Sequence, residues 1–160
     1  MATVRVGDNA PDFSLPGQDG QVVRLSELLA HGNVVVYFYP KDRTPGCTAE
    51  AGAFRNSHLR FGELGTQVVG ISSDSVESHE GFARECDLPF KILSDVDGRV
   101  RKSYGVRSSM GIIPGRVTFV IDRHGTVRHI FSSQLQATRH VDEALKVLGA
   151  LEDKVAAQRR

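Results

Sequence analysis

The sequence predicts an α/β protein in which a central mixed sheet is flanked by helices. Residues 34–39 form an unbroken run of β-branched and aromatic side chains, typical of a strand buried on both faces. A second apolar run at 67–72 follows a helical segment, which is the pattern of a parallel βαβ unit. A third run at 117–122 leads through a turn at 123–125 into a strand that returns antiparallel.

Length and composition predict a single globular domain over residues 1–160. A net charge of +1 gives no reason to expect a nucleic acid or an acidic membrane as partner. Residues 1–8 contain no apolar signal core and no run approaches the length of a membrane span, so we expect a cytoplasmic protein without membrane contact. Two cysteines do not make a disulfide scaffold, and a cytosolic cysteine pair is more often catalytic or redox-sensing.

The chain is expected to begin with a small β-hairpin. Alternating apolar residues from Phe13 to Leu25 flank the turn signal Asp19-Gly20. Ser26 is then expected to cap a short helical turn that precedes the central strand.

A helix is expected from Pro45 to about Phe61. Thr44 is a good N-cap residue, and a proline costs nothing at the first helical position because its missing N–H would have no partner there. One stripe of this helix is expected to be buried, with His58 as a core histidine. The stripe consists of Ala51, Phe54, His58 and Phe61.

Two further helices are expected in the middle of the chain. Asp74 and Glu77 have the spacing of a capping box and predict a helix that ends near Cys86. Asp95 is expected to cap another helix, which Gly105 ends. This helix would contain Val96, Val100 and Tyr104.

The C-terminal part is expected to contain a loop at 108–115, the antiparallel hairpin and a last helix capped by Thr138. Residues 151–160 are polar and are expected to fray. The inward-facing residues of the last helix are expected to be Val141, Leu145, Leu148 and Leu151. The element order βαβα…ββα is that of the thioredoxin fold, with an N-terminal hairpin and an extra helix before the last hairpin.

Cys47 falls in the first turn of the helix that follows the central strand. Free backbone N–H groups and the positive end of the helix dipole point there, and both favour the thiolate over the thiol. The carboxyl end of a sheet strand is also where open α/β folds place their sites. Most cysteines are small buried core residues, but this location favours a reactive one.

The residues around Cys47 resemble a known active-site motif. Pro40, Thr44 and Cys47 stand in the pattern Pro-x-x-x-Thr-x-x-Cys of the peroxiredoxins, and the string at 38–50 resembles the peroxiredoxin Q or bacterioferritin comigratory protein branch. Further resemblances extend over residues 7–148. The resemblance implies a thiol-dependent peroxidase that reduces hydrogen peroxide and organic hydroperoxides. It makes Cys47 the peroxidatic nucleophile, with Thr44 orienting the peroxide and Pro40 shielding the pocket.

Arg116 is the expected cationic partner of Cys47. The string at 114–122 resembles a second peroxiredoxin signature, in which an arginine opens the strand beside the cysteine. Without that resemblance, Arg116 would be interpreted as an exposed surface residue. Arg43 is the alternative candidate for the cationic partner of Cys47, and we rank it below Arg116. Glu50, one turn after Cys47, either pairs with Arg116 and holds it or is a solvated carboxylate.

The second thiol is Cys86. Many members of this branch carry a second cysteine in the Cys47 helix, but Gly52 occupies that position here. Another subgroup has its resolving cysteine in the second helix, so the resemblance implies a Cys47–Cys86 disulfide. Disulfide geometry requires Cα atoms within about 7 Å, so both segments are expected to unwind locally on oxidation. The alternative is a single-cysteine peroxidase in which Cys86 is structural.

The resemblance further implies thioredoxin or a similar dithiol as reductant, and a monomer. No metal-ligand spacing appears among the scattered histidines, and we expect neither a metal nor a cofactor. Two other functions stay open from the residues alone. A Cys–His hydrolase or transferase would need a histidine base near Cys47. A non-catalytic redox sensor or holdase would be oxidised without turnover.

Overall fold

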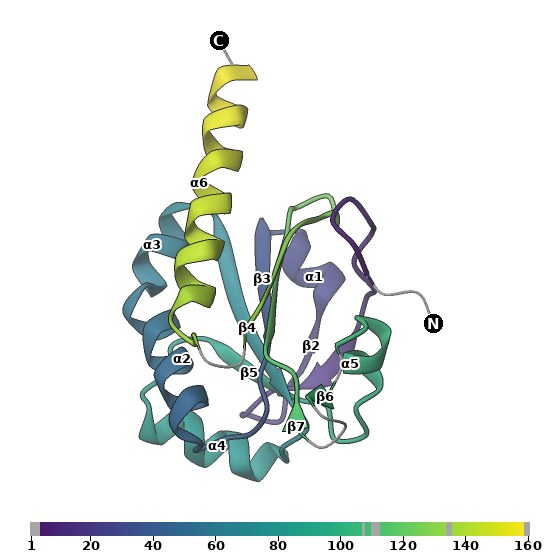
Figure 1. Cartoon of the computed structure of the whole chain (residues 1–160), viewed down its shortest axis with the longest axis vertical. Helices are drawn as coiled ribbons and strands as arrows, with labels where there is room; N and C mark the ends of the chain where they lie inside the picture. Colours follow the sequence, from purple (N-terminus) through teal and green to yellow (C-terminus); the bar gives the residue numbers. More distant parts are fainter. Residues whose placement is uncertain (1–3, 107, 110–112, 134–135, 159–160) are drawn as a thin grey trace.

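The computed structural model describes residues 4–106, 108–109, 113–133 and 136–158. Its centre is a five-stranded sheet with the strand order β5-β4-β3-β8-β9 (Figure 1). The strands are β3 (Asn33–Phe38), β4 (Thr66–Ser72), β5 (Lys91–Ser94), β8 (Val117–Ile121) and β9 (Val127–Ser132). The middle strand β3 is parallel to β4 and antiparallel to β8, which confirms the predicted mixed sheet.

Helices cover both faces of this sheet (Figure 1). One face is covered by α2 (Pro45–Asn56), α3 (His58–Glu63), α4 (Val76–Glu85) and α6 (Arg139–Gln158). The other face is covered by α1 (Leu25–Leu29), α5 (Arg99–Ser103) and the N-terminal segment. Among the described residues, no helix combines the length and the apolar character that crossing a membrane requires.

The side chains of β3 alternate between two hydrophobic cores. Val35 and Tyr37 pack among the helices α2, α3, α4 and α6. Val34, Val36 and Phe38 pack among α1, α5 and the N-terminal segment. Because both faces of the strand are buried, the central-strand prediction for this apolar run is confirmed.

The predicted N-terminal hairpin is present, formed by β1 (Ser14–Pro16) and β2 (Val22–Arg24). The short helix α1 (Leu25–Leu29) follows, but the prediction that Ser26 caps it is wrong, since Ser26 lies inside the helix and the N-cap position is Arg24. The backbone N–H of Ser26 instead donates to Asp12 Oδ1 at 2.9 Å.

The helix predicted from Pro45 to Phe61 is interrupted. Ser57 has non-helical dihedral angles (φ −102°, ψ 9°) and separates α2 from α3. Phe54 and Phe61 are buried as predicted, but His58, the residue that directly follows this break, is exposed. The prediction of a buried core histidine at position 58 is therefore wrong.

The caps of the two middle helices differ in part from the prediction. Ser75, not Asp74, caps α4, because its hydroxyl accepts from the backbone N–H of Ser78 at 3.1 Å. Asp95 does cap α5 with its side chain, which accepts from the first-turn N–H groups of Val100 at 3.2 Å and Arg101 at 3.0 Å. The N-cap position itself is Gly98, whose φ of +71° favours glycine. Val96 therefore lies outside the helix and is 69% exposed.

The C-terminal half follows the prediction closely. β8 and β9 form the expected antiparallel hairpin, and the last helix begins after Thr138, with Val141 and Leu148 buried. Within the predicted loop at 108–115, β6 (Ser108–Ser109) pairs with β7 (Ile113–Pro114), while residues 110–112 lie outside the described residues. The helix α6 extends to Gln158, into the segment that we expected to fray.

Candidate active site

Cys47 is the third residue of α2, beyond the carboxyl end of β3. Thr44 occupies the N-cap position and Pro45 the first helical position, as predicted. The Thr44 hydroxyl does not cap the helix; it donates to the Lys41 carbonyl at 3.0 Å. The backbone N–H groups of the first turn therefore have no side-chain cap beside Cys47, which is itself 1% exposed.

Arg116 lies against the Cys47 thiol. It directly precedes β8, and its neighbour Val117 pairs with Phe38 at the end of β3. Its Nη2 lies 3.4 Å from Cys47 Sγ, and the residue is 4% exposed. Arg116 is therefore not the exposed surface residue of the alternative interpretation. Gly46 allows this approach, since a Cβ there would lie 2.8 Å from Arg116 Nη2.

Glu50 holds the other side of the Arg116 guanidinium. Its Oε1 accepts from Arg116 Nη1 at 2.7 Å, a distance typical of a charge-assisted hydrogen bond. Glu50 is completely buried, so the interpretation as a solvated carboxylate is wrong. Burial raises the pKa of Glu50 to about 8, although the Arg116 guanidinium opposes this rise. Among the described residues, Oε2 has no hydrogen-bond partner.

His140 completes this buried group and was missed by sequence reasoning. It is completely buried, and its Nε2 donates to the Ser133 carbonyl at 2.9 Å. Its Nδ1 therefore accepts from the Thr118 hydroxyl at 2.8 Å and lies 3.6 Å from Glu50 Oε2. Burial lowers the pKa of His140 to about 4, which keeps the ring neutral at pH 7. The spacing of His140 with Ala144 and Leu148 on one helix face could have indicated its burial.

The remaining predicted site residues lie around this centre. Pro40 is half-buried just after β3. The competitor Arg43 is turned toward α4, where its Nε lies 3.1 Å from Glu85 Oε2. Cys86 directly follows α4 and is partly exposed, and both cysteines are free thiols. Burial raises the pKa of the Cys86 thiol, although the positive charge of Arg55 opposes the rise.

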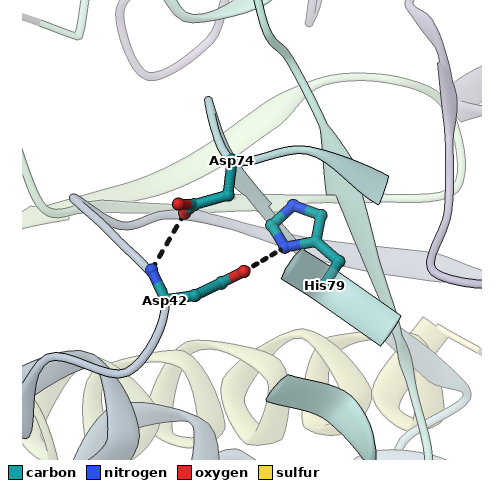
Figure 2. A group of neighbouring side chains, drawn as sticks. All are labelled: Asp42, Asp74 and His79. Carbon is teal, nitrogen blue, oxygen red and sulfur yellow. Dashed lines mark hydrogen bonds and ion pairs between the residues drawn. The ribbon is translucent and has the colours of Figure 1, made fainter. Parts of the chain in front are cut away.

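A second polar group, formed by Asp42, Asp74 and His79, offers ligand atoms within 4.8 Å of one another (Figure 2). These atoms already have protein partners. His79 Nδ1 lies 2.8 Å from Asp42 Oδ2, and Nε2 donates to the Leu93 carbonyl at 3.0 Å. Asp74 Oδ2 accepts from the Asp42 backbone N–H at 2.9 Å. Because a metal would have to displace these bonds, we interpret the group as a structural hydrogen-bond network.

Acid is expected to weaken this network through Asp42. Burial raises the pKa of Asp42, but hydrogen bonds from His79, Tyr39 and Ser78 outweigh burial and hold its pKa below the usual range. A carboxyl with a lowered pKa adds stability above the unfolded value of about 3.9 and loses it as the pH falls through the folded value. Below about pH 4, wild type should therefore lose stability more steeply than an Asp42→Asn variant. Urea unfolding between pH 7 and pH 3 measures both slopes, and equal slopes would contradict this assignment.

Comparisons with known proteins define the class to which this fold and site belong. A family model described as "AhpC/TSA family" matches residues 6–130. The chain therefore belongs to the AhpC/TSA family. It is 48% identical over 152 residues to "Peroxiredoxin Q, chloroplastic" from Sedum lineare, covering 94% of this chain and 81% of that protein.

Solved structures agree with this relationship. The chain is 42% identical to the peroxidoxin BcpB from Mycobacterium tuberculosis, with a TM-score of 0.85. This match covers 91% of this chain and 96% of that one. It is 30% identical to the bacterioferritin comigratory protein of Xanthomonas campestris, with a TM-score of 0.79 and coverages of 86% and 90%. The chain is thus a peroxiredoxin of the Q and bacterioferritin comigratory protein branch, and hence a peroxidase. The thioredoxin fold is confirmed by the same comparisons.

Proposed function

We propose that Cys47 is the peroxidatic nucleophile and that Arg116 is its catalytic partner. The observation that carries this proposal is the buried Arg116 Nη2 at 3.4 Å from Cys47 Sγ. A guanidinium at that distance can pair with the thiolate nucleophile and can also donate to a peroxide bound beside the sulfur. Glu50 acts as a positioning residue, because its bond to Nη1 fixes the guanidinium plane.

The reaction that this arrangement supports is a displacement on a peroxide oxygen. The Cys47 thiolate attacks one oxygen, the S–O bond forms, and the O–O bond breaks to leave a hydroxide or alkoxide that takes up a proton. The sulfur is oxidised to a sulfenic acid and the peroxide is reduced. Developing charge on the leaving oxygen is stabilised by Arg116 and the free N–H groups of the first helical turn. Thr44 orients the peroxide, and it can donate to it only after its hydroxyl turns away from the Lys41 carbonyl. Pro40 shields the pocket from water.

We propose hydrogen peroxide and organic hydroperoxides as substrates. The bacterioferritin comigratory protein of Xanthomonas campestris, a structural relative, is described as having alkyl peroxide reduction activity. A Cys–His hydrolase receives less support, because in the described part of the chain the polar partner of Cys47 Sγ is Arg116 and not a histidine. Location in the cytoplasm and a monomeric state stay predictions, and the Sedum lineare relative is named chloroplastic.

We also propose that Cys86 resolves the sulfenic acid. The Cys86 thiol displaces water from the Cys47 sulfenic acid, so that one S–S bond forms and one S–O bond breaks. A thioredoxin-type dithiol then reduces this disulfide by exchange. The support is that Cys86 is a partly exposed free thiol directly after α4, a helix that packs in the same core as the Cys47 helix. The alternative is a single-cysteine cycle in which an external thiol attacks the sulfenic acid.

Replacing Cys86 with serine tests the two cycles. In the Cys86→Ser variant, the first turnover with one equivalent of hydrogen peroxide should proceed at the wild-type rate, because Cys86 does not act in peroxide cleavage. Steady-state turnover with thioredoxin and thioredoxin reductase should fall at least about tenfold, since the disulfide that thioredoxin reduces cannot form. Undiminished recycling of this variant by thioredoxin would support the single-cysteine cycle.

A further inference from the structure

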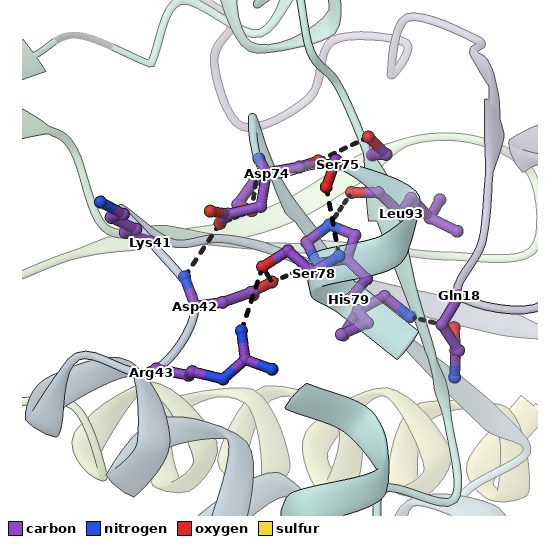
Figure 3. Close-up of polar contacts among 12 residues, drawn as sticks. Gln18, Lys41, Asp42, Arg43, Asp74, Ser75, Ser78, His79 and Leu93 are labelled. Atoms are coloured by element: carbon purple, nitrogen blue, oxygen red, sulfur yellow. Dashed lines mark hydrogen bonds and ion pairs between the residues drawn. The ribbon is translucent and has the colours of Figure 1, made fainter. Parts of the chain in front are cut away.

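The loop between β3 and α2, residues 39–44, is attached to α4 by two sets of contacts. Figure 3 shows Asp42 and Arg43 of this loop directed toward Ser78 and His79 of α4. The loop leads directly into the Cys47 helix, and Cys86 follows the last residue of α4. Contacts between loop and helix therefore connect the segments that carry the two thiols.

The inner set is buried. Asp42 Oδ2 lies 2.8 Å from His79 Nδ1 and accepts from the Ser78 hydroxyl at 2.8 Å. Tyr39 donates its hydroxyl proton to Asp42 Oδ1 at 2.7 Å. The side chains of Asp42 and His79 are 1% and 0% exposed. Separating the two members of such a buried pair leaves a buried charge without compensation, so these contacts resist opening.

The outer set is exposed and lies on the last turn of α4. The side chains of the Arg43–Glu85 ion pair are 48% and 58% exposed. Gly81 leaves space for the Arg43 guanidinium, since a Cβ at position 81 would clash with Arg43 Nη2. Arg43 also has a φ of +67°, a left-handed conformation that is strained for a residue other than glycine.

Arg55 of α2 holds the same turn from another direction. Its Nη1 donates to the Cys86 backbone carbonyl at 2.7 Å. This carbonyl belongs to the end of α4, where backbone acceptors have no partner within the helix. The last turn of α4 is thus fixed by Arg43 from the loop and by Arg55 from the Cys47 helix.

We propose that Arg43, Glu85 and Arg55 form a latch that keeps the Cys86 turn folded and apart from Cys47, and that its opening controls the rate of disulfide formation. The inner Asp42–His79 contact stays closed and acts as the pivot. An exposed ion pair contributes little and is screened by salt, so the latch opens before the pivot does. This inference rests on the proposed role of Cys86 and assigns positioning residues to that step.

The latch predicts that Glu85→Gln separates the two chemical steps. After rapid mixing with one equivalent of hydrogen peroxide and acid quenching, intact mass distinguishes the sulfenic acid, which gains oxygen, from the disulfide, which has lost two hydrogens. Sulfenic acid formation should keep its wild-type rate. Disulfide formation should become about two- to fivefold faster, the range expected for loss of an exposed ion pair. The matched control is Glu80→Gln, which removes an equal charge from α4 in an exposed pair with Arg84, away from the loop.

Salt and a double variant test the mechanism further. Raising the salt to about 0.5 M should accelerate disulfide formation in wild type and Glu80→Gln but not in Glu85→Gln. Disulfide formation in the double variant Arg43→Ala with Glu85→Gln should be no faster than in the faster single variant, because both substitutions remove the same interaction.

Equal disulfide rates in Glu85→Gln and Glu80→Gln would overturn the latch while leaving the role of Cys86 intact. A wild-type protein that retains the added oxygen and one free thiol would overturn the role of Cys86, and the latch with it.

Discussion

Replacing Cys47 with serine is expected to reduce peroxide turnover to the uncatalysed rate. The serine hydroxyl is not ionised at neutral pH and cannot form a sulfenic acid, so the Arg116 guanidinium, 3.4 Å from the sulfur in wild type, has no anion to activate. Replacing the nucleophile of other enzymes costs on the order of 10⁶-fold. Peroxide consumption with a dithiol reductant measures the loss.

The control for this experiment is the Cys86→Ser variant, which makes the same chemical change at the other cysteine. It should retain the single turnover that Cys47→Ser loses. Serine differs little from cysteine in volume, and the fold of Cys47→Ser should be verified by its unfolding midpoint. Turnover by Cys47→Ser above about one hundredth of the wild-type rate would exclude Cys47 as the nucleophile, since nucleophile replacements cost far more.

Replacing Arg116 with methionine is expected to lower kcat/KM by about 10²- to 10³-fold, the usual cost of one donor to a developing oxyanion. The same change should destabilise the protein by roughly 1–3 kcal/mol, because it removes the hydrogen-bond partner of the buried Glu50 carboxyl. Peroxide kinetics and urea unfolding measure the two effects separately.

The double variant Arg116→Met with Glu50→Gln separates catalysis from folding. The introduced glutamine cannot ionise, so the double variant should be at least as stable as Arg116→Met above pH 8, where Glu50 would otherwise lose its proton, while its activity stays low. Glu50→Gln alone keeps an acceptor for Arg116 Nη1 and should lose less activity than Arg116→Met. If Arg116→Met retains kcat/KM within about threefold of wild type, Arg116 is not the donor that peroxide cleavage requires.

Local signals in the sequence were sufficient for most of the fold. The apolar runs predicted β3, β4 and β8, because strands buried on both faces need continuous apolar residues. Thr44 and Pro45 predicted where α2 begins, since caps act within one helical turn. The interruption at Ser57 carried no comparable signal, and the exposure of His58, which directly follows it, was also missed.

The sequence by itself determined the elements of this protein, the position of Cys47 at the start of a helix and the family to which the chain belongs. It also suggested Arg116 as a partner, but left open whether Glu50 is paired or solvated. Only the tertiary structure decided that question, and only it brought His140 within 3.6 Å of Glu50. The physical reason is the sequence separation over which each effect acts. Helix caps and hydrophobic periodicity depend on residues that are close in the chain, whereas desolvation and ion pairing depend on segments that meet only after folding.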